Sequence, residues 1–102
     1  MITPEKIYSI EEIRSMLSPI LQKYRADRAL LFGSYARNTA SSNSDIDVMV
    51  IGGKDFDPTD IFCVADDLYD ISRKKVDVYE EREIDSGSEF YKNIMLEGVE
   101  IV

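Results

Sequence analysis

Apolar residues recur at helical spacing near the start of the chain, after a capping-box pair formed by Ser9 and Glu12. This pattern predicts a helix whose apolar stripe contains Ile10, Ile13, Leu17, Ile20, Leu21 and Tyr24. Pro19 lies within the same stretch, and its ring displaces one backbone hydrogen bond. The helix is therefore expected to kink, or to split near Ser18.

A second helical pattern begins at Pro58, which suits the first turn of a helix, with Asp57 as its cap. One face of this helix is apolar and comprises Ile61, Val64, Ala65, Leu68 and Ile71. Four acidic residues are expected to be mostly solvated, namely Asp60, Asp66, Asp67 and Asp70. Cys63 falls within the apolar stripe, so we expect a buried structural thiol there rather than a nucleophile.

Three further segments have the composition of β-strands, and they lie at residues 28–32, 46–51 and 75–79. Residues 34–37 between the first two are expected to form one short helical turn, and Gly52-Gly53 ends the second strand. In the third strand the side chains alternate, so Asp77 faces away from Val76 and Val78. That face could simply be the solvated side of an edge strand.

The C-terminal part of the chain predicts a last helix over residues 88–97, which Gly98 ends. The apolar tail 99–102 could extend a sheet or meet a partner, and oligomerisation is one outcome of such a contact. A length of 102 residues fits one domain, which we place at 1–102.

The chain is acidic, with a net charge of −8 from 20 acidic and 12 basic residues. This charge argues against broad capture of a nucleic-acid backbone, so nucleic acid is an unlikely partner. The one basic triplet, Arg73-Lys74-Lys75, is explained by its place at the end of a predicted helix, where cations complement the helix dipole. No apolar run approaches the ~20 residues of a membrane span, and the N-terminus lacks a signal-peptide pattern.

The residue types that are missing restrict the chemistry. The sequence has no histidine, which excludes histidine–serine catalysis and histidine metal ligands. A single cysteine allows no internal disulfide, and this fits a cytoplasmic location. The remaining metal ligands are carboxylates, which favour Mg²⁺ or Mn²⁺ over zinc.

The candidate chemistry lies in the segment that joins the first two strands. Gly33-Ser34 follows an apolar strand, and such a small-residue turn can present backbone N–H groups to a phosphate. Asp45 and Asp47 then stand at positions i and i+2 of the next strand, on one face and roughly 6–7 Å apart. Two such carboxylates can share the paired metal ions of a phosphoryl-transfer site. The alternative is that both aspartates serve only as turn or cap residues.

Residues 33–37 and 44–50 together resemble the signature of the DNA polymerase β-type nucleotidyltransferases, and within them the minimal nucleotidyltransferases, abbreviated MNT. The order of elements matches that family from about residue 10 to the end. The resemblance implies an α/β fold of the α+β type, a nucleotidyltransferase-like palm with a small mixed sheet of three to four strands flanked by helices. It also implies a third carboxylate on the strand after the long helix, where Asp77 stands. Asn38 departs from the family pattern because a glycine is common there, but asparagine tolerates the left-handed backbone region.

The resemblance implies in-line displacement at the α-phosphate of ATP or another nucleoside triphosphate. Asp45 and Asp47 would hold two Mg²⁺ ions, and Asp77 would complete the second ion's shell and take the acceptor proton. Gly33 would admit the triphosphate and Ser34 would bond to its oxygens. Arg37 would pair with the same phosphates, or it would form only a surface salt bridge.

Three functions compete at this stage. The resemblance to MNT antitoxins of toxin–antitoxin pairs implies transfer of AMP to a tyrosine of a HEPN ribonuclease toxin. The second is transfer to RNA or a small molecule, and the third is a non-catalytic antitoxin that blocks a toxin by contact. An enzyme is favoured by the intact residues Gly33, Ser34, Asp45, Asp47 and Asp77. The absence of an acceptor-binding domain in this sequence favours a separate protein acceptor.

Overall fold

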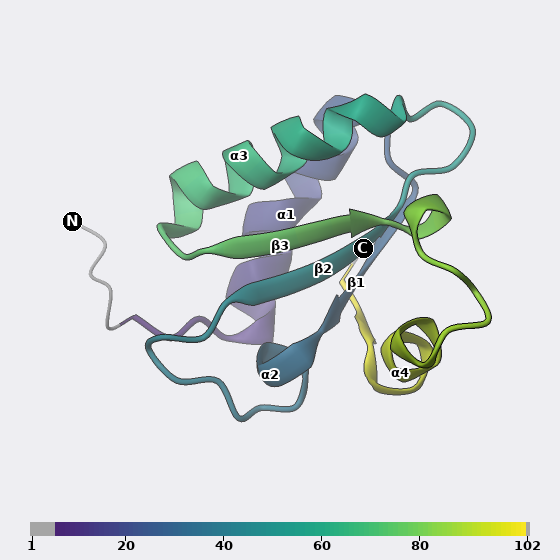
Figure 1. Ribbon diagram of the computed structural model, residues 1–102. Coiled ribbons are helices and arrows are strands. Elements are labelled where there is room, and N and C mark those ends of the chain that lie inside the picture. Colours follow the sequence, from purple (N-terminus) through teal and green to yellow (C-terminus); the bar gives the residue numbers. More distant parts are fainter. Residues whose placement is uncertain (1–5, 102) are drawn as a thin grey trace.

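The computed structural model describes residues 6–101 and contains one mixed four-stranded sheet (Figure 1). Its strand order is β3-β2-β1-β4, with β1 antiparallel to β2 and β4, and β2 parallel to β3. The strands are β1 (Arg28–Phe32), β2 (Ile46–Ile51), β3 (Val76–Glu80) and β4 (Val99–Glu100). The expected α+β fold with a small mixed sheet is therefore confirmed.

Two helices, α1 (Ile10–Tyr24) and α3 (Ile61–Ser72), cover one face of the sheet (Figure 1). The strands alternate, so Val48 and Val50 of β2 point into this main core while Asp47 and Met49 point to the other face. The main core also receives Ile13, Leu17, Leu21, Leu31, Val64 and Leu68, all fully buried. Burial of two helix faces against one side of the sheet supplies most of the hydrophobic stabilisation.

The opposite face is only partly covered, by α4 (Glu89–Glu97) (Figure 1). Ile94 of α4 packs on Phe32 and Met49 and forms a second, smaller core. A Ser88 side chain that accepts from the Tyr91 N–H begins this helix. Val99 and Glu100 of the predicted apolar tail form β4 and pair with β1, so the tail extends the sheet, which was one of its two predicted roles. Val102 lies outside the described residues.

Three local predictions need correction. The helix α1 runs unbroken from Ile10 to Tyr24, so the predicted split at Ser18 is wrong. Pro19 and Ser15 are both exposed, and water can therefore satisfy the carbonyl that the proline leaves without a donor.

Cys63 and Ile71 were expected on the buried face of α3, yet both are exposed. The residues that α3 buries are Ile61, Val64, Leu68 and Ser72, and Cys63 lies off that stripe. Ile71 keeps 44% of its surface exposed at the rim of the groove between α1 and α3.

Asp67 is also less solvated than expected, because its carboxylate accepts hydrogen bonds from Tyr24 Oη at 2.8 Å and Lys23 Nζ at 3.2 Å. These bonds join α3 to α1. None of the helices formed by residues 6–101 has both the length and the apolar character that crossing a membrane requires.

Candidate active site

The first part of the site is the turn that connects β1 to the short helix α2 (Gly33–Ala36). Gly33 has φ +73°, a left-handed conformation that glycine adopts without strain. A Cβ atom at this position would lie 2.3 Å from Asp47 Oδ2, so any larger residue would displace the Asp47 carboxylate. The tight approach places the Gly33-Ser34 turn directly against an acidic side chain of β2.

The second part is a row of side chains across the open face of the sheet. In register, Phe32 of β1 lies opposite Asp47 of β2, and Asp47 lies opposite Asp77 of the parallel strand β3. Residues opposite one another in a sheet share a face, so both carboxylates point to the side that α4 only partly covers. Two acids that are 30 residues apart in the chain thus become neighbours.

This arrangement raises the pKa of Asp47 to about 6. Partial burial is the main cause, and the adjacent Asp77 adds both charge repulsion and a carboxyl–carboxyl hydrogen bond. Asp45 contributes further repulsion, while the nearby Arg37 acts in the opposite direction. An excess of negative charge at one point is typical of a site that binds a cation or handles a proton.

Asp45 precedes β2 and is half-buried, with its Oδ2 3.6 Å from Lys75 Nζ. Lys74 is only 5% exposed, and its ammonium donates to the Ser42 carbonyl at 2.7 Å. This bond ties the loop that carries Asp45 to the start of β3. Sequence reasoning explained the basic triplet by the helix dipole and missed both contacts, because each bridges segments about 30 residues apart.

Arg37 follows α2 and forms a salt bridge with Glu97 of α4, with Nη1 2.9 Å from Oε2. The side chain is 52% exposed, so this pair contributes little to stability. Of the two predictions for Arg37, the structure shows the salt bridge, and the guanidinium still lies close enough to lower the pKa of Asp47. Asn38 takes the left-handed conformation expected of it, with φ +62°.

The acids of this site have the chemistry of metal ligands. Among residues 6–101, no three acidic or cysteine side chains are arranged as a ready set of ligands. Asp47 and Asp77 are nevertheless adjacent, and both offer the hard oxygen atoms that Mg²⁺ and Mn²⁺ prefer. A divalent cation beside them would offset the repulsion that raises the Asp47 pKa. Asp45 could join them by exchanging its contact with Lys75.

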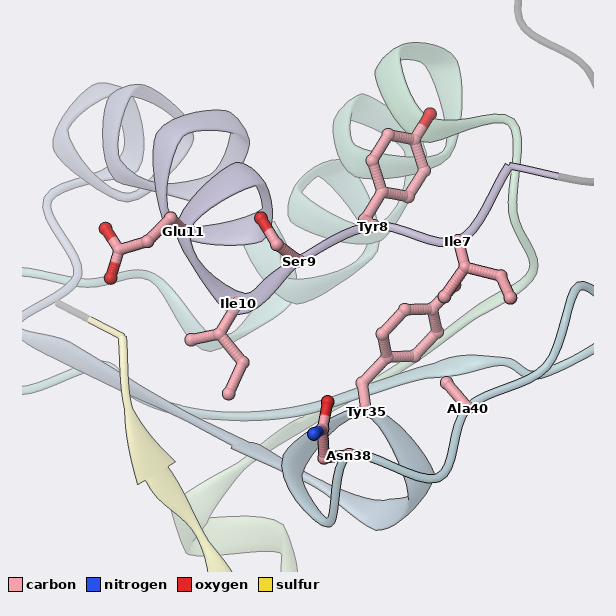
Figure 2. A pocket seen from close by; sticks show the side chains of 8 residues that line it. All are labelled: Ile7, Tyr8, Ser9, Ile10, Glu11, Tyr35, Asn38 and Ala40. Atoms are coloured by element: carbon pink, nitrogen blue, oxygen red, sulfur yellow. The ribbon is translucent and has the colours of Figure 1, made fainter.

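A separate pocket of about 410 Å³ lies between α2 and the segment that leads into α1 (Figure 2). Its lining residues are Ile7, Tyr8, Ser9, Ile10, Glu11, Tyr35, Asn38 and Ala40, and none of the candidate site residues is among them. Tyr35 is 3% exposed and its hydroxyl makes no hydrogen bond within the described residues. Gly33 and Tyr35 thus belong to opposite sides of one short helix, and the pocket is distinct from the row of acids.

A family model described as "Polymerase beta, Nucleotidyltransferase" matches the chain from residue 15 to residue 102. The chain belongs to the polymerase β nucleotidyltransferase family. It is therefore a nucleotidyltransferase, and the matched region contains the Gly33-Ser34 turn and all three aspartates.

One curated relative, from Methanocaldococcus jannaschii, is named "Putative protein adenylyltransferase" and is 40% identical over 70 residues. The matched segment is 69% of this chain and 75% of that protein. This similarity agrees with the nucleotidyltransferase assignment.

Two solved structures share the fold. A chain described as "putative minimal nucleotidyltransferase" has a TM-score of 0.74 at 22% identity, over 90% of this nucleotidyltransferase and 95% of that chain. A chain from the complex of the tri-AMPylated Shewanella oneidensis HEPN toxin with MNT antitoxin has a TM-score of 0.69 at 18% identity. That match covers 91% of this chain and 71% of the other.

Proposed function

We propose that this nucleotidyltransferase transfers AMP from ATP to a hydroxyl of a partner protein, in a reaction that depends on Mg²⁺. The observation that carries the proposal is the contact between the Gly33 turn and Asp47, with Asp77 at its side. A phosphate-binding turn next to two carboxylates is the arrangement that nucleotidyl transfer needs.

In the proposed reaction the Gly33 turn, the Ser34 hydroxyl and Arg37 bind the β- and γ-phosphates. The acceptor oxygen attacks the α-phosphorus and forms a new P–O bond, while the bond to pyrophosphate breaks on the opposite side. Asp77 accepts the proton of the acceptor hydroxyl. Two Mg²⁺ ions held by Asp45, Asp47 and Asp77 would neutralise the charge that develops on the phosphates and on the attacking oxygen.

For the acceptor we propose a tyrosine of a HEPN-type toxin, which makes this nucleotidyltransferase an antitoxin. Two similarities support this acceptor: a relative is named as an adenylyltransferase of proteins, and a structure of the same fold comes from a complex with an AMPylated HEPN toxin. A tyrosine hydroxyl has an unperturbed pKa of about 10, so it needs a base and a cation close by before it attacks well.

The deciding experiment mixes the protein with ATP, Mg²⁺ and a purified HEPN-type toxin, and looks for added AMP on that toxin by mass spectrometry. We expect AMP on the partner with the wild-type protein, and at least about 100-fold slower transfer with Asp47→Asn or Asp77→Asn. Asp66→Asn is the matched control, because it removes the same charge from the exposed side of α3 and should leave transfer unchanged.

Two outcomes would contradict the proposal. Label on RNA or on a small metabolite, with none on the partner, would show a different acceptor. Neutralisation of the toxin without any label, unaffected by Asp77→Asn, would show an antitoxin that acts by contact alone.

A further inference from the structure

An aromatic cluster stands beside the two acids, on the same face of the sheet. Phe90 of α4 contacts Phe32 of β1 and Tyr79 of β3, with ring centroids 5.6 Å and 5.4 Å apart. Phe32 lies opposite Asp47 in the strand register, and Tyr79 follows Asp77 by two residues on the same face. Three elements thus direct rings to the edge of the acidic site.

Phe90 is the exposed member of this cluster. It keeps 42% of its surface accessible, whereas Phe32 keeps 9% and anchors the cluster in the second core. The Phe90 ring is inclined at 80° to Phe32 and at 75° to Tyr79, so neither ring stacks face to face on it. Ile94, which is 1% exposed, also attaches α4 to the sheet. Phe32 and Tyr79 thus support the Phe90 ring, and its exposed part is accessible to a ligand.

From these contacts we propose that Phe90 stacks on the base of the bound nucleoside triphosphate. Successive residues on one face of a strand are about 7 Å apart, and the ribose separates the α-phosphorus from the base by a similar span. With the triphosphate at Gly33 and the α-phosphate over Asp47 and Asp77, the base extends toward Tyr79, the next residue on that face of β3. Phe90 packs against both Tyr79 and Phe32 at this point. This inference rests on the proposed function, since it assumes that the triphosphate binds at Gly33.

We infer that Phe90 contacts the base of the nucleotide and not a side chain of the acceptor, because the aromatic cluster is joined to the phosphate-binding turn. Phe32, which supports Phe90, is the residue directly before Gly33. The phosphate-binding turn and the support of the aromatic ring are thus parts of one short segment, and one ligand can contact both. Every base has an aromatic face, so the contact favours binding without selecting one base strongly.

The test compares two ligands in the presence of Mg²⁺: ATP, and tripolyphosphate, which lacks the base and the ribose. By calorimetric titration, Phe90→Ala should weaken ATP binding about tenfold and leave tripolyphosphate binding unchanged. Leu96→Ala is the matched control, because Leu96 is an 84% exposed apolar residue of the same helix. It should change neither affinity.

A second variant gives an optical readout. The chain has no tryptophan, so Phe90→Trp introduces a single tryptophan at the proposed contact, which can be excited selectively over tyrosine. Its emission should change on addition of ATP and should not change with tripolyphosphate, and its affinity for ATP should equal or exceed that of the wild type.

The inference is overturned if Phe90→Ala binds ATP as tightly as the wild type does. If transfer to the partner falls in that case, the ring serves the acceptor instead. An equal loss for both ligands would show that the variant disturbs α4, and it would also overturn the inference. If the wild type binds neither ligand, the proposed function itself fails, which separates the two proposals.

Discussion

At the level of single residues, Asp47 lies in the middle of the candidate site, where partial burial and the neighbouring Asp77 disfavour its ionised form. Its pKa of about 6 lies above the ordinary value of 3.8, so the native state is destabilised by the ionised carboxylate. This effect is absent below about pH 4, grows between about pH 4 and 6, and is complete above that range. The site therefore keeps a group whose charge costs stability at neutral pH, which is common where function requires the charge.

The residue-level prediction follows from that sign. In the absence of divalent cations, Asp47→Asn should raise the free energy of unfolding by about 1–2 kcal/mol at pH 7.5, a value reduced for solvent screening. At pH 4 the difference between variant and wild type should nearly vanish. Urea denaturation at both pH values measures this difference in the free energy of unfolding. Asp66→Asn is the control for the loss of one negative charge. A variant that unfolds at every pH would show that Asp47 has a structural role.

At the level of elements, α1 accommodates a proline that helices usually exclude from their interior. The helix keeps a complete capping box at Ser9 and buries four residues against the sheet and α3, so its packing outweighs the local cost of Pro19. Pro19→Ala should restore one backbone hydrogen bond to the Ser15 carbonyl and stabilise the domain by about 1–3 kcal/mol. Thermal denaturation measures the change, and Ser15→Ala, which should shift stability by only a few tenths of a kcal/mol, is the control. A lower stability of Pro19→Ala would mean that the proline fits this helix better than its missing donor suggests.

At the level of the whole molecule, the chain has a net charge of −8, which repels the polyanionic nucleotide that the proposed function requires it to bind. The cations near the site are paired, Arg37 with Glu97 and Lys75 with Asp45, so attraction of the nucleotide depends on added Mg²⁺. We expect single-stranded RNA to bind more weakly than about 10⁻⁴ M even at low salt, as fluorescence anisotropy would measure. Micromolar binding that weakens steeply with salt would contradict this and would favour an RNA acceptor.

The sequence by itself determined the elements and the identity of the candidate residues. Helical spacing and the Ser9 cap located α1, an apolar run ended by Gly52-Gly53 located β2, and alternation located β3. Local spacing identified the Gly33-Ser34 turn with Asp45 and Asp47, and the family resemblance added Asp77. These features depend on interactions between residues close in the chain, and such interactions are readable from a single sequence. The burial of Cys63 was predicted wrongly because the apolar stripe of α3 lies one helical position away from it.

Only the tertiary structure decided which distant residues meet. The family resemblance implied that Asp77 joins the acid pair, and the physical cause is the parallel pairing of β2 with β3, which places Asp77 beside Asp47. The contact of Phe90 with Phe32 and Tyr79 was not anticipated. The buried Lys74 that ties the Asp45 loop to β3 could not be anticipated either. Strand order and register result from the packing of all the elements around one core, and no local pattern encodes that collective choice.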